Sequence, residues 1–141
     1  MIYCNVNDQL ATPSLIDHIE AAIVGGLQQV DLPLKHVFTE GLYQRIIHMP
    51  AGTILTSRVH KKEHPFVVMQ GCCIVINETD GTRELVKAPY SGITKAGTRR
   101  ALLIITDTIW ATFHVTDLKD HEQIIAEFTD EAVNPLIKKL Q

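Results

Sequence analysis

Residues Gly52 to Gly71 read Gly-Thr-Ile-Leu-Thr-Ser-Arg-Val-His-Lys-Lys-Glu-His-Pro-Phe-Val-Val-Met-Gln-Gly, and they combine two histidines with strand-like alternation. The alternation over Ile54–His60 predicts a strand with Arg58 and His60 on one face, because successive strand side chains point to opposite sides. His64 follows a short charged connection and is expected where a second strand begins. Neutral imidazole is a versatile metal ligand, so two histidines at the mouth of this hairpin can converge on one cation.

Length and composition are those of one ordinary globular domain. A chain of 141 residues can bury a core without staples, and its apolar share of 45% is typical. The net charge of −3 argues against a nucleic-acid partner, for which a basic surface is expected. No apolar run reaches the length of a membrane span, and the first residues lack the pattern of a signal peptide. We therefore expect a cytoplasmic protein with no membrane partner.

The three cysteines are Cys4, Cys72 and Cys73, an odd number without the spacing of a disulfide framework. We expect reduced thiols, in keeping with a cytoplasmic location. A redox or metal-binding thiol is the less favoured alternative, because free cysteine usually behaves as a small buried hydrophobe.

Helices are expected at both ends of the chain. Apolar residues at helical spacing predict a helix over 13–28, and they are Leu15, Ile19, Ile23 and Leu27. The C-terminal helix is expected to begin near Asp117 or Asp120, and Asn134-Pro135 is typical of one final turn. Residues 30–38 contain Pro33 and are predicted to be extended or irregular.

The middle of the chain has the pattern of about eight short strands. They are predicted at Leu42–His48, Ile54–His60, Phe66–Gln70, Cys72–Asn77, Thr82–Lys87, Gly92–Lys95, Arg100–Thr106 and Ile109–Val115. Hairpin turns are predicted at Asp80-Gly81 and Asp107-Thr108. Even spacing of short strands favours a sandwich or barrel. The expected organisation is an N-terminal helical segment (1–30), a β-barrel core (40–116) and a C-terminal helical segment (117–141).

Gly52–Gly71 resembles the first motif of the cupin superfamily, G-x5-H-x-H-x3-E-x6-G, in spacing over its whole length. His60 matches the second histidine, whereas Arg58 stands at the first histidine and His64 at the glutamate. The resemblance implies a mainly β, single-domain cupin, which is a double-stranded β-helix or jelly-roll barrel. Gly97 aligns with the internal glycine of the second cupin motif, where Arg100 takes the histidine position.

A replacement for that missing histidine is expected on the neighbouring strand. We expect Ile109–His114 to run antiparallel beside Arg100–Thr106. With a two-residue loop, His114 pairs with Ala101 and faces away from the interior; with one extra residue or a bulge, it pairs with Leu102 and lines the barrel. A partly exposed edge histidine is the alternative role for His114.

The resemblance then implies a three-histidine site formed by His60, His64 and His114, for a divalent transition metal such as Fe, Zn, Ni or Mn. Without a carboxylate ligand the ion keeps its full double charge and attracts an anionic or hydroxylated small molecule. The Arg58 guanidinium can grip a carboxylate or phosphate in bidentate fashion.

Four further residues are candidates for binding that molecule, namely Tyr43, Arg45, Arg100 and Trp110. Tyr43 and Arg45 alternate on one strand face and equally suit an interface, and Trp110 equally suits the core. The remaining histidines are predicted to be surface or capping residues, and they are His18, His36, His48 and His121.

Three functions stay open at this point. The first is a metal-dependent cupin, and if it is an enzyme, a dioxygenase- or isomerase-like one, because known three-histidine cupins include thiol dioxygenases. The second is a non-catalytic cupin that has lost its metal and joins an assembly; the arginines at two ligand positions favour it. The third is a metal-free sugar epimerase-like cupin in which a histidine acts as base. A homodimer is expected in each case.

The chain from about Leu32 to Asp120 also resembles small cupin-domain proteins of tailed bacteriophages. The similar stretches begin at Gly41-Leu-Tyr-Gln-Arg and end at Asp107-Thr-Ile-Trp-Ala-Thr-Phe-His114. This resemblance implies a phage-encoded protein that acts in the cytoplasm of the infected host or is a component of the virion.

Overall fold

Eleven strands and two helices form the described part of this computed structural model, which covers residues 13–26, 28–78, 80–130, 134 and 136. The strands are β1 Leu34–Thr39, β2 Leu42–Met49, β3 Ile54–Thr56, β4 Val59–His60, β5 His64–Gln70, β6 Cys72–Asn77, β7 Arg83–Lys87, β8 Tyr90–Thr94, β9 Arg100–Ile104, β10 Thr108–Val115 and β11 Thr129–Asp130. The helices are α2 Leu15–Gly26 and α3 His121–Phe128.

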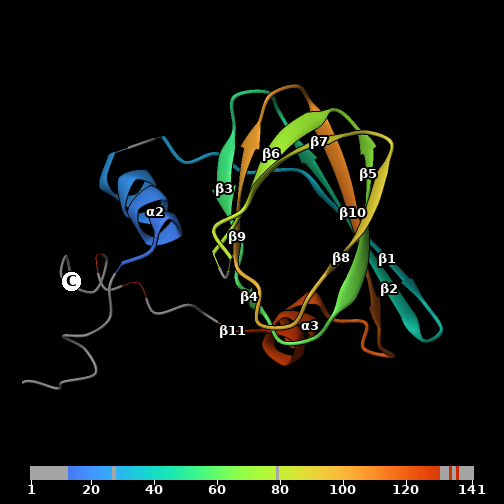
Figure 1. The fold of residues 1–141 in the computed structure, drawn as a ribbon. Helices are drawn as coiled ribbons and strands as arrows, with labels where there is room; N and C mark the ends of the chain where they lie inside the picture. The colour runs from blue at the N-terminus through green and yellow to red at the C-terminus, as the bar shows by residue number, and fades with distance from the viewer. Residues whose placement is uncertain (1–12, 27, 79, 131–133, 135, 137–141) are drawn as a thin grey trace, which may run out of the picture.

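Two antiparallel sheets face each other around the interior (Figure 1). The larger sheet has the order β1-β2-β10-β5-β8, and the smaller one has the order β3-β9-β6-β7. The short strands β4 and β11 form a separate pair. The prediction of a mainly β jelly-roll barrel with helices towards both ends is confirmed.

The chain crosses from one sheet to the other between β9 and β10. Strand β9 pairs with β3 and β6, whereas β10 lies between β2 and β5. The predicted hairpin of these two strands is therefore wrong, together with both pairings proposed for His114. In this jelly roll some consecutive strands pair, such as β1 with β2 and β6 with β7, but others, such as β9 and β10, join opposite sheets. Proximity in sequence alone therefore does not predict the pairing.

Inward-facing apolar residues of both sheets make the main core. The larger sheet contributes Ile47, Met49, Phe66, Val68 and Trp110, and the smaller sheet contributes Cys73, Val75, Val86 and Ile104. These positions alternate with outward residues along each strand, as expected of sheets with one buried face. Cys72 and Cys73 are free thiols, and burial, with a smaller contribution from Cys72, raises the pKa of Cys73 to about 11. Cys4 lies outside the described residues.

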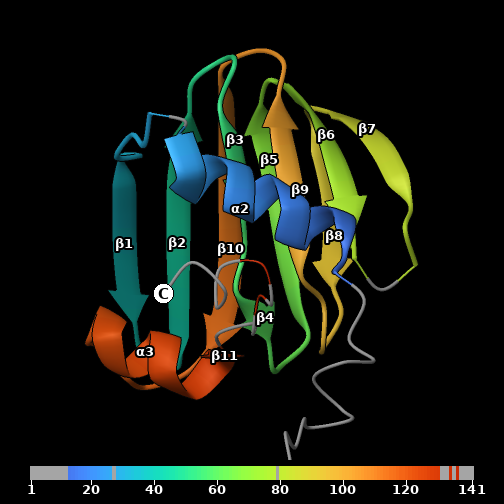
Figure 2. The ribbon, with the colours of Figure 1, turned by 90° about the vertical axis from the view of Figure 1, so that its left-hand side faces the viewer.

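Helix α2 packs on the outer face of the smaller sheet (Figure 2). Its start is fixed by a reciprocal cap: Asp17 N–H donates to Ser14 Oγ at 3.0 Å, and Ser14 N–H donates to Asp17 Oδ2 at 2.9 Å. Ile16 is fully buried against Ile76 and Ala101. The small side chain of Ala101 allows the helix to approach the sheet closely.

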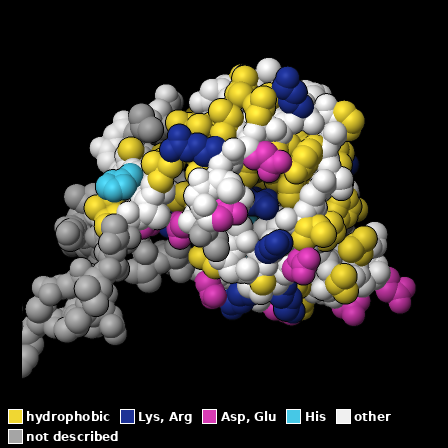
Figure 3. All heavy atoms as spheres, viewed as in Figure 1, with side chains coloured by type: hydrophobic (Ala, Val, Ile, Leu, Met, Phe, Trp, Pro, Cys, Tyr) yellow, Lys and Arg dark blue, Asp and Glu magenta, His cyan; other side chains and the backbone are white. Residues whose placement is uncertain are grey.

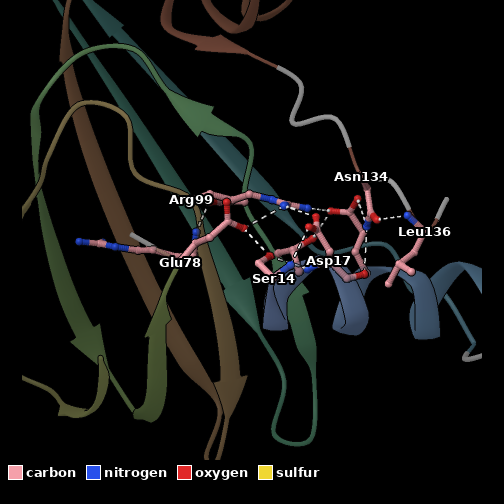
Figure 4. Close-up of polar contacts among 10 residues, drawn as sticks. Ser14, Asp17, Glu78, Arg99, Asn134 and Leu136 are labelled. Carbon is pink, nitrogen blue, oxygen red and sulfur yellow. Dashed lines mark hydrogen bonds and ion pairs between the residues drawn. The ribbon is translucent and has the colours of Figure 1, made fainter. Parts of the chain in front are cut away.

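A buried arginine strengthens the attachment of α2. Arg99, which precedes β9, donates hydrogen bonds to Asp17 at 2.8 Å, Glu20 at 2.7 Å and Glu78 at 3.0 Å. Asn134 donates to the Asp17 carbonyl oxygen at 3.0 Å and so joins the same cluster (Figure 4). Three carboxylates around one guanidinium connect the helix, the β6–β7 region and the start of β9.

Helix α3 lies across one end of the barrel (Figures 1 and 2). It begins after Asp120, whose side chain accepts a hydrogen bond from Glu122 N–H, so the second predicted start is correct. Its buried residues Ile124 and Phe128 pack against Tyr43. No helix in the described ranges is both long and apolar enough to span a membrane.

Some predicted bounds differ from the structure. The predicted strand Ile54–His60 is divided into β3 and β4, which pair with different partners. Residues 34–39 form a regular strand that follows directly on Pro33, which agrees with the extended alternative predicted for 30–38. The pair of β4 with β11 had no recognisable pattern, because strands of two residues show no periodicity. The helix predicted over 13–28 is shorter, and Leu27 lies outside the described residues.

Candidate functional site

A cavity of about 270 Å³ lies between the two sheets and is bordered by α3. We call it the main cavity, because the three predicted metal-binding histidines line it. Its lining holds four histidines and three arginines, and no Asp or Glu is among the described lining residues. These residues are His60, His64, His114, His121, Arg45, Arg58 and Arg100. A cavity with this lining favours an anionic occupant, because Arg45 and Arg100 bring positive charge to it and its described lining residues include no carboxylate.

The register of the larger sheet arranges the inward residues in layers. Tyr43 pairs with His114, and His64 contacts His114 through its ring; we call these three the histidine layer. One step along the strands, the arginine layer consists of Arg45, Thr112 and Phe66. The apolar layer follows with Ile47, Trp110 and Val68. Polarity therefore falls from the α3 end towards the barrel interior.

Three imidazoles gather in and beside the histidine layer. The ring centroids of His60 and His64 are 4.7 Å apart, and those of His64 and His114 are 4.3 Å apart. His64 comes from β5 and His114 from β10, while β4 supplies His60. The structure thus brings together the three histidines predicted from the sequence, although it does so without the predicted β9–β10 hairpin.

The backbone holds two of these histidines in defined positions. His60 N–H donates to Thr98 O at 3.1 Å, and the His60 carbonyl accepts from Gly97 N–H at 2.7 Å. His64 Nδ1 lies 3.2 Å from the Lys62 carbonyl oxygen. A carbonyl only accepts, so Nδ1 of His64 carries the proton and its Nε2 lone pair is available as a ligand.

All three imidazoles are held in the neutral form. Burial, with smaller contributions from His64, Arg100 and Arg45, lowers the pKa of His60 to about 4. Burial, with the neighbouring His64, His60 and Arg45, lowers the pKa of His114 to about 3. Burial also lowers the pKa of His64. Neutral imidazole is the form that binds a metal.

The donor set suits a transition metal, but the present ring orientations do not form a finished site. Among the residues that the structure describes, no group of three or more His, Cys, Asp or Glu side chains is arranged to hold a metal ion. The rings of His60, His64 and His114 pack against one another at 60° and 42°. His60 Nδ1 is buried without a hydrogen-bond partner, so a donor atom is available there.

Three of the four buried polar atoms that lack a partner in the described ranges belong to this cavity. They are Arg45 Nε, His60 Nδ1 and Thr112 Oγ1, and the fourth is Arg99 Nε. Buried polar groups in native proteins almost always have partners, and a group without one indicates a functional position or an absent ligand. The cavity is where this protein concentrates such groups.

Arg100 is positioned by the protein itself. Its Nε donates to Asn77 Oδ1 at 3.1 Å and its Nη1 to Thr94 Oγ1 at 3.0 Å, and its guanidinium lies 5.1 Å from the centre of the Phe66 ring. It borders a second cavity of about 570 Å³, which includes Asp80, Glu84 and Lys95. Figure 3 shows a hollow in the middle of that view, with cationic and acidic side chains around it.

The other predicted binding residues also reach the main cavity. Tyr43 is 1% exposed and Trp110 is 6% exposed, and both line it, so Trp110 is core and wall at once. Arg58 borders the cavity but is exposed, because the division between β3 and β4 takes it out of the expected strand alternation.

Two histidines predicted for the surface lie nearer the site than expected. His121 opens α3 and lines the cavity, and its ring centroid is 4.3 Å from that of His36. His36 Nδ1 is 2.6 Å from the Tyr43 hydroxyl. His18 and His48 are exposed, as predicted. Thr112 was not recognised from the sequence, although it alternates with Trp110 and His114.

No family model matches the sequence, and no curated protein matches it either. Several solved structures resemble this fold. One of these structures is a cupin superfamily protein from Desulfitobacterium hafniense, with 8% identity, a TM-score of 0.52, and coverage of 69% of this chain and 87% of that one. The fold is that of the cupins. A second structure, a Klebsiella pneumoniae protein with a double-stranded β-helix domain, has 16% identity, a TM-score of 0.51, and coverage of 64% of this chain and 89% of that one.

An enzyme is also among the similar solved structures. Salicylate 1,2-dioxygenase from Pseudoaminobacter salicylatoxidans has 14% identity and a TM-score of 0.55, with coverage of 80% of this chain and 31% of that chain. At such identities the likeness concerns the fold alone.

Proposed function

We propose that the protein is a metal-dependent cupin that binds a small anionic molecule in the main cavity, with His60, His64 and His114 as metal ligands. The observation that carries this proposal is the group of three neutral imidazoles in a cavity whose described lining has arginines and no carboxylate. Three imidazoles suit Fe, Zn, Ni or Mn and leave part of the coordination sphere open.

Each histidine has a defined part in this proposal. His64 presents Nε2 because its Nδ1–H is held by the Lys62 carbonyl. His60 offers its unpartnered Nδ1, and His114 rotates from its packing against His64 towards the same point. A bound divalent ion would act as a Lewis acid on an anionic or hydroxylated ligand. If the protein is an enzyme, dioxygenase- or isomerase-like chemistry is expected.

Metal content tests this proposal. Protein purified under reducing conditions and supplied with Fe(II), Mn(II), Ni(II) or Zn(II) should retain about one equivalent of one of these ions, measured by elemental analysis. The variants His60→Ala and His64→Ala should lose it, and His48→Ala, an exposed histidine on the outer face, should not. Absence of bound metal in wild-type protein, or full retention in His60→Ala, would contradict the proposal.

The sugar epimerase-like alternative is less well supported. A histidine base works best with a pKa near the working pH, and an acidic partner usually orients it. The pKa of His114 is about 3 and that of His60 about 4, and no Asp or Glu is among the described lining residues. Neutral, weakly basic imidazoles suit metal binding better than proton abstraction.

A role in an assembly is the second candidate, and the outer face of the larger sheet favours it. The outward residues of β2, β5 and β10 include no Asp, Glu, Lys or Arg, and they are Leu42, Gln44, Ile46, His48, Pro65, Val67, Met69, Ile109, Ala111, Phe113 and Val115. An uncharged apolar face of this kind matches a second copy of itself, so we propose a homodimer through this face.

A phage-encoded role also remains a proposal, supported by the sequence resemblance alone. In that setting the protein would act in the host cytoplasm or be a virion component. Mass spectrometry of purified virions separates the two, because a virion component is present at a fixed ratio to capsid protein. Absence from virions would leave only the cytoplasmic role.

A further inference from the structure

We propose that Arg45 and Thr112 together anchor a carboxylate, so that the cavity takes a small monocarboxylic acid with an apolar body. This inference rests on the proposed small-molecule binding in the same cavity, but it does not require the metal. It assigns the ligand class, and it replaces Arg58 by Arg45 as the residue that holds the charge.

Arg45 is a half-buried cation whose Nε atom is fully buried. Among the described residues it forms no ion pair, and its Nε has no hydrogen-bond partner. Arg99, by contrast, is surrounded by three carboxylates. A guanidinium that is withdrawn from water without a compensating charge is costly, and a bound carboxylate removes that cost by accepting hydrogen bonds from its fork.

The second polar atom without a hydrogen-bond partner is Thr112 Oγ1, on the strand next to Arg45. It is the direct cross-strand partner of Arg45 in the β2–β10 pair, and both side chains line the cavity. Thr112 is 9% exposed, and its Oγ1 has no partner. A hydroxyl and a guanidinium on adjacent strands can both donate to one carboxylate.

The surroundings of this pair specify the rest of the ligand. On one side the apolar layer continues with Ile47 and Trp110, and Met49 lies beyond it. These side chains suit an aromatic or branched aliphatic body. Arg100 already bonds to Asn77 and Thr94, so Arg45 is the guanidinium with unused donors. A single guanidinium with unused donors balances the one negative charge of a carboxylate better than the two charges of a phosphate dianion.

Benzoate and its neutral isostere benzamide test the proposal in the full-length protein. Calorimetric titration, performed with and without divalent metal, should show benzoate binding and at least tenfold weaker benzamide binding. Arg45→Met should weaken benzoate binding about tenfold to a hundredfold, and Thr112→Val should weaken it less. Arg83→Met, which removes an exposed arginine on β7, should leave it unchanged.

Two measurements separate anchoring from a structural role. The thermal midpoint of ligand-free Arg45→Met should not fall, because the substitution removes a half-buried charge that has no ion-pair partner among the described residues. In wild-type protein, benzoate should shift the Nε resonance of Arg45 and leave that of Arg99 in place. This nuclear magnetic resonance measurement needs no variant, so it decides the matter even if Arg45→Met fails to fold.

The outcomes also distinguish this inference from the metal proposal. Benzoate binding to metal-free protein supports the Arg45 anchor, whatever the metal analysis gives. Benzoate binding only in the presence of metal, equal binding of benzamide, tighter binding of inorganic phosphate, or no binding at all would each overturn it. An unchanged Arg45 resonance at saturating benzoate would overturn it as well.

Discussion

Arg99 donates a 2.8 Å hydrogen bond through Nη1 to Asp17 Oδ1, although 82 positions separate the two residues. The Arg99 side chain is only 3% exposed, and that of Asp17 is 10% exposed. The apolar contact between α2 and the barrel is small and centres on Ile16. This ion pair therefore carries much of the attachment of the helix.

Replacing Arg99 by Met should detach α2 and destabilise the protein by about 3–5 kcal/mol, because buried carboxylates lose their counter-charge. Urea unfolding measures the loss, and hydrogen exchange should show faster exchange in Leu15–Gly26 than in β10. Arg83→Met, which removes an exposed guanidinium, should change the free energy of unfolding by less than about 0.5 kcal/mol. Equal stability of both variants would refute the role assigned to Arg99.

The attachment of α2 should weaken in acid. Burial raises the pKa of Asp17, but hydrogen bonds from Arg99 and Ser14 outweigh it, so the pKa lies below its ordinary value of 3.8. A carboxyl with a lowered folded-state pKa stabilises the protein above its unfolded pKa, and this contribution is lost as the pH falls through the folded value. The free energy of unfolding of wild-type protein should therefore fall below about pH 4 more steeply than that of Asp17→Asn. Identical slopes for wild-type protein and Asp17→Asn would disprove the assignment.

Gly71→Ala should lower the free energy of unfolding by more than the about 1–3 kcal/mol that a strained backbone conformation alone costs. Gly71 has φ of +92°, and a Cβ there would overlap the backbone of Asp107 and Thr108. Gly41 also has positive φ, at +75°, but open space surrounds its Cβ position. Gly41→Ala is thus the control for backbone strain alone, expected to cost about 1–2 kcal/mol. Thermal unfolding that ranks the two variants in the opposite order would count against the close contact at Gly71.

Met69→Lys should convert the proposed homodimer to monomer. Met69 is 46% exposed on the outer face formed by β2, β5 and β10, where no Asp, Glu, Lys or Arg points outward, and burying a lysine there against a second copy would cost a desolvated charge. Leu85→Lys is the matched control, because Leu85 is 53% exposed on β7 of the other sheet. Sedimentation should give a monomer for the first variant and a dimer for the second. A wild-type monomer at high concentration would exclude the dimer.

The Gly52–Gly71 spacing was enough to predict the jelly roll, and it placed His60 and His64 correctly at the cavity. The position of His114 in the larger sheet could not be derived, because strand pairing in this fold is non-local. The inward side of Thr112 was accessible in principle, since it alternates with Trp110 and His114. The lack of a hydrogen-bond partner for the Thr112 hydroxyl could not be predicted, because it depends on contacts between strands that are far apart in sequence.

The predictions for Arg58 and His121 were wrong in opposite directions. Arg58 was predicted to point into the site but is exposed at its border, whereas His121 was not expected at the cavity but lines it. The alternation that placed Arg58 beside His60 assumed an unbroken strand, but the chain leaves β3 at Thr56 and resumes pairing only at Val59. His121 was predicted to be a surface or capping residue. The helix lies across the barrel end, so its first residue reaches the cavity.

Adjacent arginines at the start of β9 raise the question of what prevents misfolding by a shift of one position. Arg99 points to the α2 cluster and Arg100 to the cavity, so a one-residue slip would still place an arginine at one of the two sites but put Thr98 or Ala101 at the other. Size adds to this discrimination. Ala101 lies fully buried beneath Ile16, and a slip would force Leu102 or Arg100 into that space. The small side chain of Ala101 thereby helps to fix which arginine meets the carboxylates around α2 and which one meets the cavity.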